Sequence, residues 1–414
     1  MLRLARRLLT ALLVLLVVLA GAVTWVFSGR IHSAALEVRP AEPSYDIEVV
    51  SVADDRIVLD DTADHRDALH RGWTYGLRWE GGSGLVEGPA EEQGDQVGLG
   101  FRVVEGVAPR AGTEVDAFRD LWTDAAAASA EATDSADGTD STDSTDGTGL
   151  ALRAVRYGAG DHSLPAYVAE PRAEAPQPGT AGPDRSHWAV LVHGKGGTPL
   201  EMVRMARDLV AAGRTVMLIG YRNDAGAWQD PSGQYAYGRT EWRDLHAALV
   251  WAHDHGARDV VLGGASMGGG IVASYLEHVE DHHGVSGVVL DSPMLDLDTV
   301  VSWGARDERL PGGLPLPEPI TWAAKRVAGL RYDVGWESLD YVDGPGGTDW
   351  ADVPVLVLHG DADGTVPVSL SRDLARADDD VRLEEFPGAG HVESWNSDPG
   401  RYDELVTGFV SDLG

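Results

Sequence analysis

The sequence contains no cysteine, and this absence removes several kinds of chemistry at once. Without a thiol the chain can form no disulfide, use no thiolate nucleophile and build no zinc–thiolate site. Lysine is scarce too: only Lys195 and Lys325 occur, so arginine supplies nearly all the positive charge. The formal net charge is -33 at pH 7, which repels nucleic acid and anionic membrane surfaces. We therefore expect no nucleic-acid partner.

Apolar residues, in contrast, are plentiful: they make up 43% of the 414 residues, enough for a sizeable core. A chain of this length suggests two or three units, one of which could be a large α/β core. Composition along the chain divides it into parts. We expect a transmembrane signal-anchor at residues 1–30, a small β-rich unit at 31–123, an acidic low-complexity linker at 124–149 and an α/β domain at 150–414.

The first residues bear on the compartment. Arg3, Arg6 and Arg7 precede an apolar run from Leu8 to Phe27 that is long enough to cross a bilayer as a helix. By the positive-inside rule the arginines stay in the cytoplasm, so the rest of the chain lies outside it as a single-pass membrane protein. The alternative is a signal peptide cleaved near residues 20–22, which would release a secreted protein. The apolar run continues past that site, which favours the anchor.

The β-rich unit shows short strand-like runs but no recognisable chemistry. These runs lie at 47–52, 56–59, 73–79 and 98–104. Trp73, Tyr75 and Trp79 recur at period two, which is more typical of one buried strand face than of a ligand platform.

The linker repeats Asp, Ser, Thr and Gly, and its aspartates recur at every third position: Asp134, Asp137, Asp140, Asp143 and Asp146. A calcium loop of the EF-hand kind needs oxygen ligands at alternate positions and a closing glutamate, so this spacing does not fit one. We interpret the segment as a solvated linker.

Beyond the linker, strand and helix patterns alternate. A hairpin at 150–157 and 163–169 and a Pro/Ala-rich loop at 171–183 precede near-continuous apolar runs typical of covered parallel strands, at 188–193, 215–221, 259–264, 285–291 and 353–359. Helical spacing separates them at 200–212, 238–255 and 267–279. This alternation predicts a doubly wound, mostly parallel sheet with its ligand site at the carboxyl ends of the strands. The segment at about 295–352, which is rich in proline and tryptophan, interrupts this alternation and resembles a lid. Within it we expect a helix at 320–329.

One serine stands at the turn between a strand and a helix. Residues 264–268 read Gly-Ala-Ser-Met-Gly and fit G-x-S-x-G, in which a sharp turn lifts the hydroxyl of Ser266 above the sheet. Gly264 and Gly268 suit a place where strand and helix pass too close for a Cβ. The pattern also arises by chance in a chain with 51 glycines, but the strand before it and the helix after it favour a nucleophile elbow.

A serine nucleophile needs a base, an acid and donors for an oxyanion. We assign the acid to Asp363, directly after the last strong apolar strand, and the base to His391, on the loop after a strand at 381–386. The order Ser, Asp, His is that of α/β-hydrolases. The backbone N–H groups of Lys195, in the loop His-Gly-Lys-Gly-Gly after the first parallel strand, and of Met267 are the candidate oxyanion donors.

Several alternatives stay open. Asp361 is the nearest rival of Asp363, and Asp291 or Asp296 after the preceding strand is a weaker one.

Other polar residues have simpler interpretations. His193 and His359 each end an apolar strand, where a structural hydrogen bond is more typical than catalysis. Lys195 does not belong to a phosphate-binding loop, because the Walker pattern places a hydroxyl residue directly after the lysine and here Gly196 follows.

Residues 150–414 closely resemble the α/β-hydrolase superfamily and, within it, the Bem46-like, dipeptidyl-peptidase-related serine hydrolases of actinobacterial type. The resemblance is carried by HGKGG at 193–197, YRND at 221–224, TEWRDL at 240–245, GASMGG at 264–269, LDSPMLD at 290–296, HGDADGTVP at 359–367 and GAGHVESWN at 388–396. It implies hydrolysis of carboxylic esters, thioesters or amides through an acyl-serine. Many relatives carry a bulky residue where Ala265 stands, and the parts before residue 150 lie outside the resemblance.

The sequence thus predicts a membrane-anchored, extracytoplasmic serine hydrolase acting on a small ester, amide or peptide. A peptidase of extracellular peptides and a non-catalytic binding protein with the same fold remain the alternatives. No metal or organic cofactor is expected, because the histidine that activates the serine also activates the hydrolytic water. The sequence does not indicate the oligomeric state.

Overall fold

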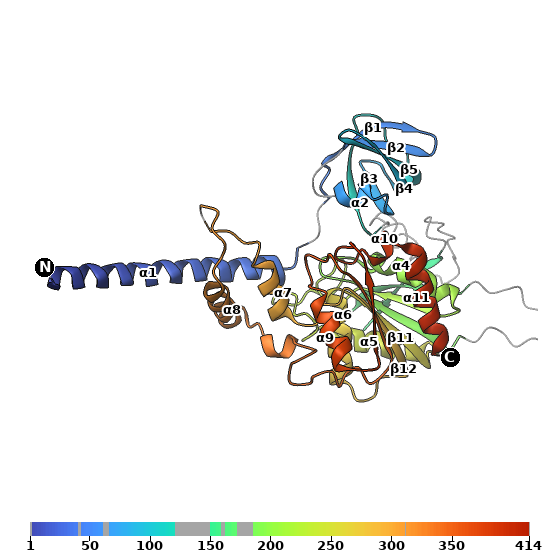
Figure 1. The fold of residues 1–414 in the computed structure, drawn as a ribbon. Coiled ribbons are helices and arrows are strands. Elements are labelled where there is room, and N and C mark those ends of the chain that lie inside the picture. Colours follow the sequence, from blue (N-terminus) through green and yellow to red (C-terminus); the bar gives the residue numbers. More distant parts are fainter. Residues whose placement is uncertain are drawn as a thin grey trace, which may run out of the picture.

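The computed structural model describes residues 2–39, 43–60, 66–120, 150–158, 162–171, 185–310 and 312–413. A long N-terminal helix projects from an α/β domain, and a small β-barrel lies against another side of that domain (Figure 1). The aspartate-rich linker, with the calcium loop considered there, lies outside the described residues, as does nearly all of the predicted loop at 171–183.

The α/β domain is built on an eight-stranded mixed sheet with the order β14-β13-β12-β11-β9-β10-β8-β7. β9 to β14 run parallel, whereas β8 pairs antiparallel with β10 and with β7. The strands are β7 Leu152–Tyr157, β8 Leu164–Ala169, β9 His187–Val192, β10 Thr215–Ile219, β11 Asp259–Ala265, β12 Val285–Asp291, β13 Val355–Gly360 and β14 Val381–Phe386. The predicted α/β fold class is therefore confirmed.

Helices cover both faces of this sheet, which explains why its strands are apolar on both sides. One face packs on α4 Val203–Ala211, preceded by the 3-10 turn η2 Pro199–Met202, and on α11 Pro399–Asp412. The other packs on α5 Trp242–Asp254, α6 Met267–His278 and α9 Ser369–Ala377. A further short helix, α10 Ser394–Ser397, follows β14.

An insertion separates β12 from β13 at the position of the predicted lid. It contains α7 Leu297–Gly304, α8 Glu318–Tyr332 and the 3-10 turn η3 Trp336–Leu339. The predicted helix at 320–329 forms the middle of α8, while α7 was not anticipated.

The N-terminal β-rich unit is a closed antiparallel barrel with the order β1-β2-β5-β4-β3-β6. Its elements are β1 Ile47–Ala53, β2 Arg56–Asp60, α2 Arg66–His70, β3 Tyr75–Trp79, β4 Gly82–Gln93, β5 Gln96–Gly106 and β6 Glu114–Phe118. Tyr75 and Trp79 are buried in the barrel core, as their period-two spacing indicates, and Trp73 packs at its edge. The predicted strands correspond to β1, β2, β3 and β5, but β4 and β6 were missed.

The chain begins with α1 Leu2–Ile31, which continues into the π-helical turn η1 His32–Leu36. Within the described residues this is the helix long and apolar enough to span a membrane. Residues 6–22 are exposed except for the half-buried Ala20, whereas Thr24, Phe27 and Ser28 are buried where α1 packs on α8. The helix therefore has a long uncovered N-terminal part and a shorter C-terminal part that packs on the α/β domain.

Candidate active site

Ser266 occupies the turn between β11 and α6, as the elbow motif predicts. Its backbone has φ 49° and ψ -117°, a conformation that L-residues adopt only when the surroundings enforce it. Neighbouring backbone supplies this constraint. A Cβ on Gly268 would lie 2.1 Å from the carbonyl oxygen of Val192, and one on Gly264 would lie 2.7 Å from backbone atoms of Gly268. Both glycines are therefore required by the close passage of strand and helix.

The structure brings the three residues of the predicted triad together from three separate loops. Ser266 Oγ lies 2.9 Å from His391 Nε2, and His391 Nδ1 lies 2.7 Å from Asp363 Oδ2. The other oxygen of Asp363 accepts hydrogen bonds from the backbone N–H groups of Thr365 and Val366, each at 2.8 Å. Burial alone would raise the pKa of Asp363, but hydrogen bonds from His359 and His391 outweigh it and hold this pKa well below its usual range. The carboxylate is thus ionised and oriented toward His391.

The rival acids lie elsewhere. Asp361 is exposed and accepts a hydrogen bond from the backbone N–H of Gly388 at 2.6 Å. Asp296 caps α7 by accepting from Asp298 N at 2.8 Å. Asp291 is buried beneath the loop that carries His391, where the hydroxyls of Ser292 and Ser394 donate to it at 3.2 and 3.3 Å. None of these contacts reaches the imidazole of His391.

His193 and His359, the two histidines interpreted as structural, are fully buried and hydrogen-bonded. His359 Nδ1 lies 2.7 Å from Ser371 Oγ, and its Nε2 lies 3.2 Å from Asp363 Oδ2, so it supports the acid from behind. His193 Nε2 lies 2.9 Å from Asp224 Oδ2. Burial would lower the pKa of His193, but the Asp224 carboxylate raises it.

The loop after β9 passes directly over the nucleophile. A Cβ on Gly194 would lie only 3.2 Å from Cβ of Ser266. The N–H of Gly194 donates to Glu201 Oε2 at 2.6 Å and is thereby engaged within the protein. Met267 is the first residue of α6, so its N–H has no intrahelical acceptor. The N–H groups of Lys195 and Met267 remain the predicted oxyanion donors.

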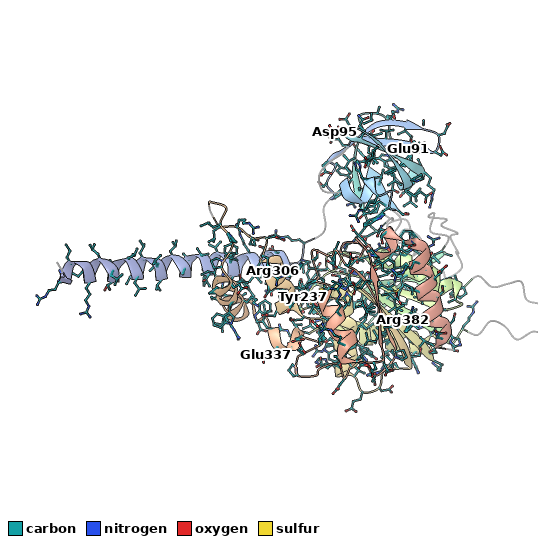
Figure 2. The ribbon with its side chains drawn as sticks, viewed as in Figure 1. Glu91, Asp95, Tyr237, Arg306, Glu337 and Arg382 are labelled. Atoms are coloured by element: carbon teal, nitrogen blue, oxygen red, sulfur yellow. The ribbon has the colours of Figure 1, made fainter. Side chains whose placement is uncertain are left out.

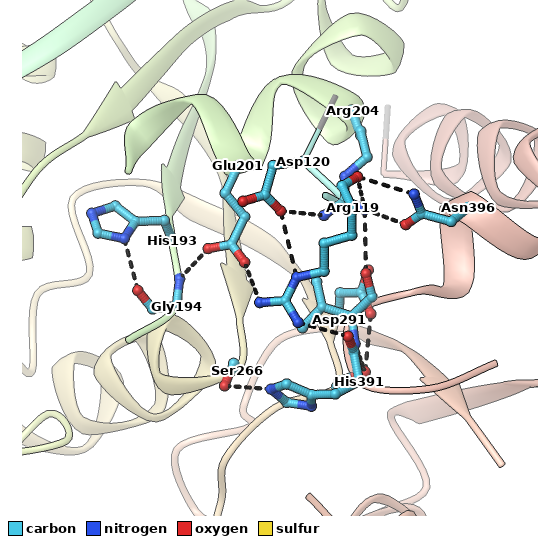
Figure 3. Close-up of polar contacts among 12 residues, drawn as sticks. Arg119, Asp120, His193, Gly194, Glu201, Arg204, Ser266, Asp291, His391 and Asn396 are labelled. Carbon is cyan, nitrogen blue, oxygen red and sulfur yellow. Dashed lines mark hydrogen bonds and ion pairs between the residues drawn. The ribbon is translucent and has the colours of Figure 1, made fainter. Parts of the chain in front are cut away.

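Arg119 and Glu201 are charged residues beside the candidate triad that were not anticipated from the sequence. Arg119 follows β6 of the barrel and donates through Nη1 to the carbonyl oxygen of His391 at 2.9 Å and through Nη2 to Glu201 Oε1 at 3.3 Å (Figure 3). Burial would lower the pKa of Arg119, but the carboxylates of Asp120 and Glu201 more than offset this and raise it. Arg119 therefore joins the loop that carries His391 to the loop above Ser266.

Further contacts hold the histidine loop, residues 388–396, against the barrel. The hydroxyl of Tyr75 donates to Glu393, whose other oxygen accepts from the N–H of Gly390 at 3.0 Å. Arg71 Nη1 donates to Gly388 O at 3.1 Å, and Asn396 Nδ2 donates to Thr74 O at 2.7 Å. The barrel is thus part of the structure that positions His391.

A pocket with a volume of about 390 Å³ opens beside Ser266. Its walls come from the end of α1, from η1 and from the insertion, together with Lys195 and Tyr237. Tyr237 lies beside the end of α1, and Arg306 belongs to the insertion, between α7 and α8 (Figure 2). Among the described residues, no group of three or more His, Asp or Glu side chains could hold a metal ion.

Comparison with known proteins assigns the family. A profile described as "Alpha/beta hydrolase family" matches residues 189–405, more than half of the chain, and the protein belongs to this family. A search of curated proteins found no match.

Solved structures with a similar fold include enzymes named as esterases. An esterase from Pyrococcus furiosus shares 17% identity with a TM-score of 0.48, covering 67% of this chain and 97% of its own. Est1E from Butyrivibrio proteoclasticus shares 16% identity with a TM-score of 0.44, covering 63% and 98%. A membrane phospholipase A described as a bacterial virulence factor shares 18% identity with a TM-score of 0.42, covering 64% and 87%. At these identities the similarity concerns the fold.

Proposed function

We propose that this protein is a membrane-anchored, extracytoplasmic serine hydrolase that cleaves carboxylic ester or amide bonds through an acyl-serine intermediate. The observation that carries the proposal is the continuous chain of contacts from Ser266 through His391 to Asp363. Membership of the α/β hydrolase family supports it. The finer assignment, to the Bem46-like hydrolases of actinobacterial type, rests on the sequence motifs.

In this proposal His391 Nε2 removes the proton from Ser266 Oγ as the oxygen attacks the substrate carbonyl carbon. The negative charge on the carbonyl oxygen is met by the N–H groups of Lys195 and Met267. The bond to the leaving group then breaks, and His391 donates its proton to that group. Water, deprotonated by the same nitrogen, attacks the acyl carbon and returns Ser266 to its hydroxyl form. Asp363 stabilises the imidazolium in both halves of the reaction.

The anchor and its orientation form part of the proposal. The length and apolar character of α1 support a membrane span, and Arg3, Arg6 and Arg7 at its start favour a cytoplasmic N-terminus. Protease protection in membrane vesicles of known orientation tests this directly. A secreted, cleaved protein is the alternative outcome.

The reaction type is tested with a panel of p-nitrophenyl acyl esters beside aminoacyl and dipeptidyl anilides. We expect ester turnover that Ser266→Ala and His391→Ala reduce to background, because both remove a participant in proton transfer. Faster turnover of the anilides would make the protein a peptidase. No turnover of any substrate by the folded wild type would contradict the proposal and favour a binding protein.

A further inference from the structure

The pocket beside Ser266 has an unusual wall. Apolar lining comes from Phe27 and Ile31 of α1. The insertion adds Val300, Val301 and Leu316, and Ser266 lines the same pocket. Because α1 is also the helix that could span a membrane, one continuous helix runs from the proposed bilayer segment to the surroundings of Ser266. Apolar lining of this kind suits a hydrocarbon chain.

The end of α1 is built into the enzyme. The ammonium of Lys195 donates to the carbonyl of Ala34, and the hydroxyl of Tyr237 donates to the carbonyl of Ala35 at 2.7 Å. The N–H of Tyr235 donates to the carbonyl of Leu36, also at 2.7 Å, and the Leu36 side chain is buried in the domain core. The α1 wall of the pocket is therefore fixed to the same loop that carries the predicted oxyanion donor.

The apolar run Leu8–Phe27 of α1 has the length of a bilayer core. Its residues are exposed or half-buried up to Val23, and burial against α8 begins at Thr24. Twenty helical residues span roughly 30 Å, the thickness of the hydrocarbon layer. Phe27 is the last residue of that span, and at about 1.5 Å per residue Ile31 lies about 6 Å beyond it. The pocket then opens at the level of the lipid headgroups or just outside them.

The insertion presents apolar side chains toward the same level. Leu314, Trp322 and Leu330 are 64%, 60% and 89% exposed, and Trp25 on α1 is 58% exposed. The guanidinium of Arg331 lies 3.7 Å from the centroid of the Trp25 ring. In Figure 1, α8 and the segment before it reach further along α1 toward the N-terminus than the rest of the α/β domain. Tryptophan and arginine together are typical of a membrane interface.

We infer that the substrate is a membrane amphiphile, an acyl ester whose hydrocarbon chain passes from the bilayer along α1 into the pocket beside Ser266. This inference rests on the proposed serine hydrolase activity and adds the substrate class and its route. Short, water-soluble esters still reach the serine, but they leave the apolar walls uncovered. Longer acyl chains displace water from these walls, so their transition states are bound more tightly.

The test uses the full-length protein in phosphatidylcholine vesicles, which avoid repulsion by the acidic chain. We expect kcat/KM for p-nitrophenyl esters to rise from butyrate to dodecanoate, by up to about fourfold for each methylene that enters the pocket, which corresponds to ~0.8 kcal/mol per buried CH₂. We expect p-nitrophenyl palmitate to be hydrolysed at least about tenfold faster when it shares a vesicle with the enzyme than when it resides in separate vesicles, because lateral entry avoids transfer through water.

A substitution in the α1 wall separates the pocket from the triad. Ile31→Trp fills space on the α1 side and should reduce the dodecanoate-to-butyrate ratio by at least about tenfold, the equivalent of two lost methylene contacts. Val250→Trp, at an exposed position on α5, is the matched control and should retain the wild-type ratio. Labelling of Ser266 by a soluble fluorophosphonate verifies that each variant is folded and has an intact triad.

Either of two results would overturn the assignment of the hydrocarbon chain to this pocket. They are a flat chain-length profile in the wild type and an Ile31→Trp ratio equal to that of Val250→Trp. Equal rates from shared and separate vesicles would refute the lateral route. In each case butyrate turnover and fluorophosphonate labelling would persist, so the proposed hydrolase activity would stand. Loss of both in the wild type would instead remove the proposed function itself.

Discussion

Arg119 offers a test of whether the barrel takes part in organising the catalytic site. It belongs to the N-terminal unit, yet its guanidinium contacts the carbonyl of His391 and the carboxylate of Glu201. Arg119→Met retains most of the apolar length of the side chain and removes only the charged donors. We therefore expect this variant to loosen both loops while leaving the core of each unit intact.

The magnitudes follow from these contacts. A hydrogen bond to a charged group contributes about 1.5–3 kcal/mol, whereas breaking a fully buried ion pair costs about 3–5 kcal/mol. The side chain of Arg119 is 34% exposed and Arg204 stays close to Glu201, so the second contribution is reduced. We expect the free energy of unfolding to fall by about 2 kcal/mol. Since misplacing a catalytic group by ~1 Å can cost about 10²-fold, we expect kcat to fall between about tenfold and 10²-fold.

Steady-state kinetics on a butyrate ester and urea unfolding measure these two effects separately. A loss of positioning lowers kcat and leaves KM nearly unchanged, because ground-state binding is not affected. Arg119→Lys should restore only part of kcat, since an ammonium cannot make both contacts in the same geometry. Arg110→Met, at an exposed position of the same barrel, is the control. Wild-type kcat in a folded Arg119→Met protein would refute a positioning role.

Three further predictions concern the triad, the elbow and the pH dependence of stability. Asp363→Asn should lower kcat by roughly 10⁴-fold with little change in the fold, because an amide holds His391 in the wrong tautomer. Gly268→Ala should lower the free energy of unfolding by at least about 2 kcal/mol, since its Cβ would meet the backbone of Val192 at 2.1 Å. Burial and the Asp403 carboxylate raise the pKa of Asp208 to about 8. The native state therefore holds a proton that the unfolded state releases above about pH 4, so stability should fall between about pH 4 and pH 8, and Asp208→Asn should flatten this slope in urea titrations.

Each of these predictions has a control and a contradicting outcome. Asp361→Asn should be much milder than Asp363→Asn, and the reverse order would assign the acid to Asp361. Gly408→Ala on α11, where an added Cβ would meet no atom within 4 Å, should be neutral or stabilising by up to about 1 kcal/mol. Destabilisation like that of Gly268→Ala would reject the steric argument. Equal pH slopes in the wild type and Asp208→Asn would exclude a native-state proton at that site.

Local sequence patterns predicted the α/β sheet and the three residues that the structure brings into contact as a candidate triad, because the physical cause of each pattern is local. β12 has the predicted bounds 285–291, since a strand covered on both faces must be apolar throughout. Ser266 was found because the tight turn requires glycines on both sides of it. Asp363 and His391 follow β13 and β14, where the carboxyl ends of parallel strands bring loops together.

The missed features depend on partners distant in the chain. β4 contains glycine, proline and glutamate, which are rare in strands, and its conformation follows from pairing with β3 and β5. Arg119 and Glu201 are joined across the interface of two units, and no local pattern indicates such a pair. The apolar run of α1 predicted a membrane span but carries no information on which end lines a pocket.

We propose that Ser266 is a nucleophile activated by His391. A fluorophosphonate probe followed by peptide mapping measures this without assuming any substrate. We expect one label per chain, located on Ser266, and loss of labelling in both Ser266→Ala and His391→Ala. An unlabelled wild type beside a control hydrolase that reacts, or a label on another residue, would contradict it.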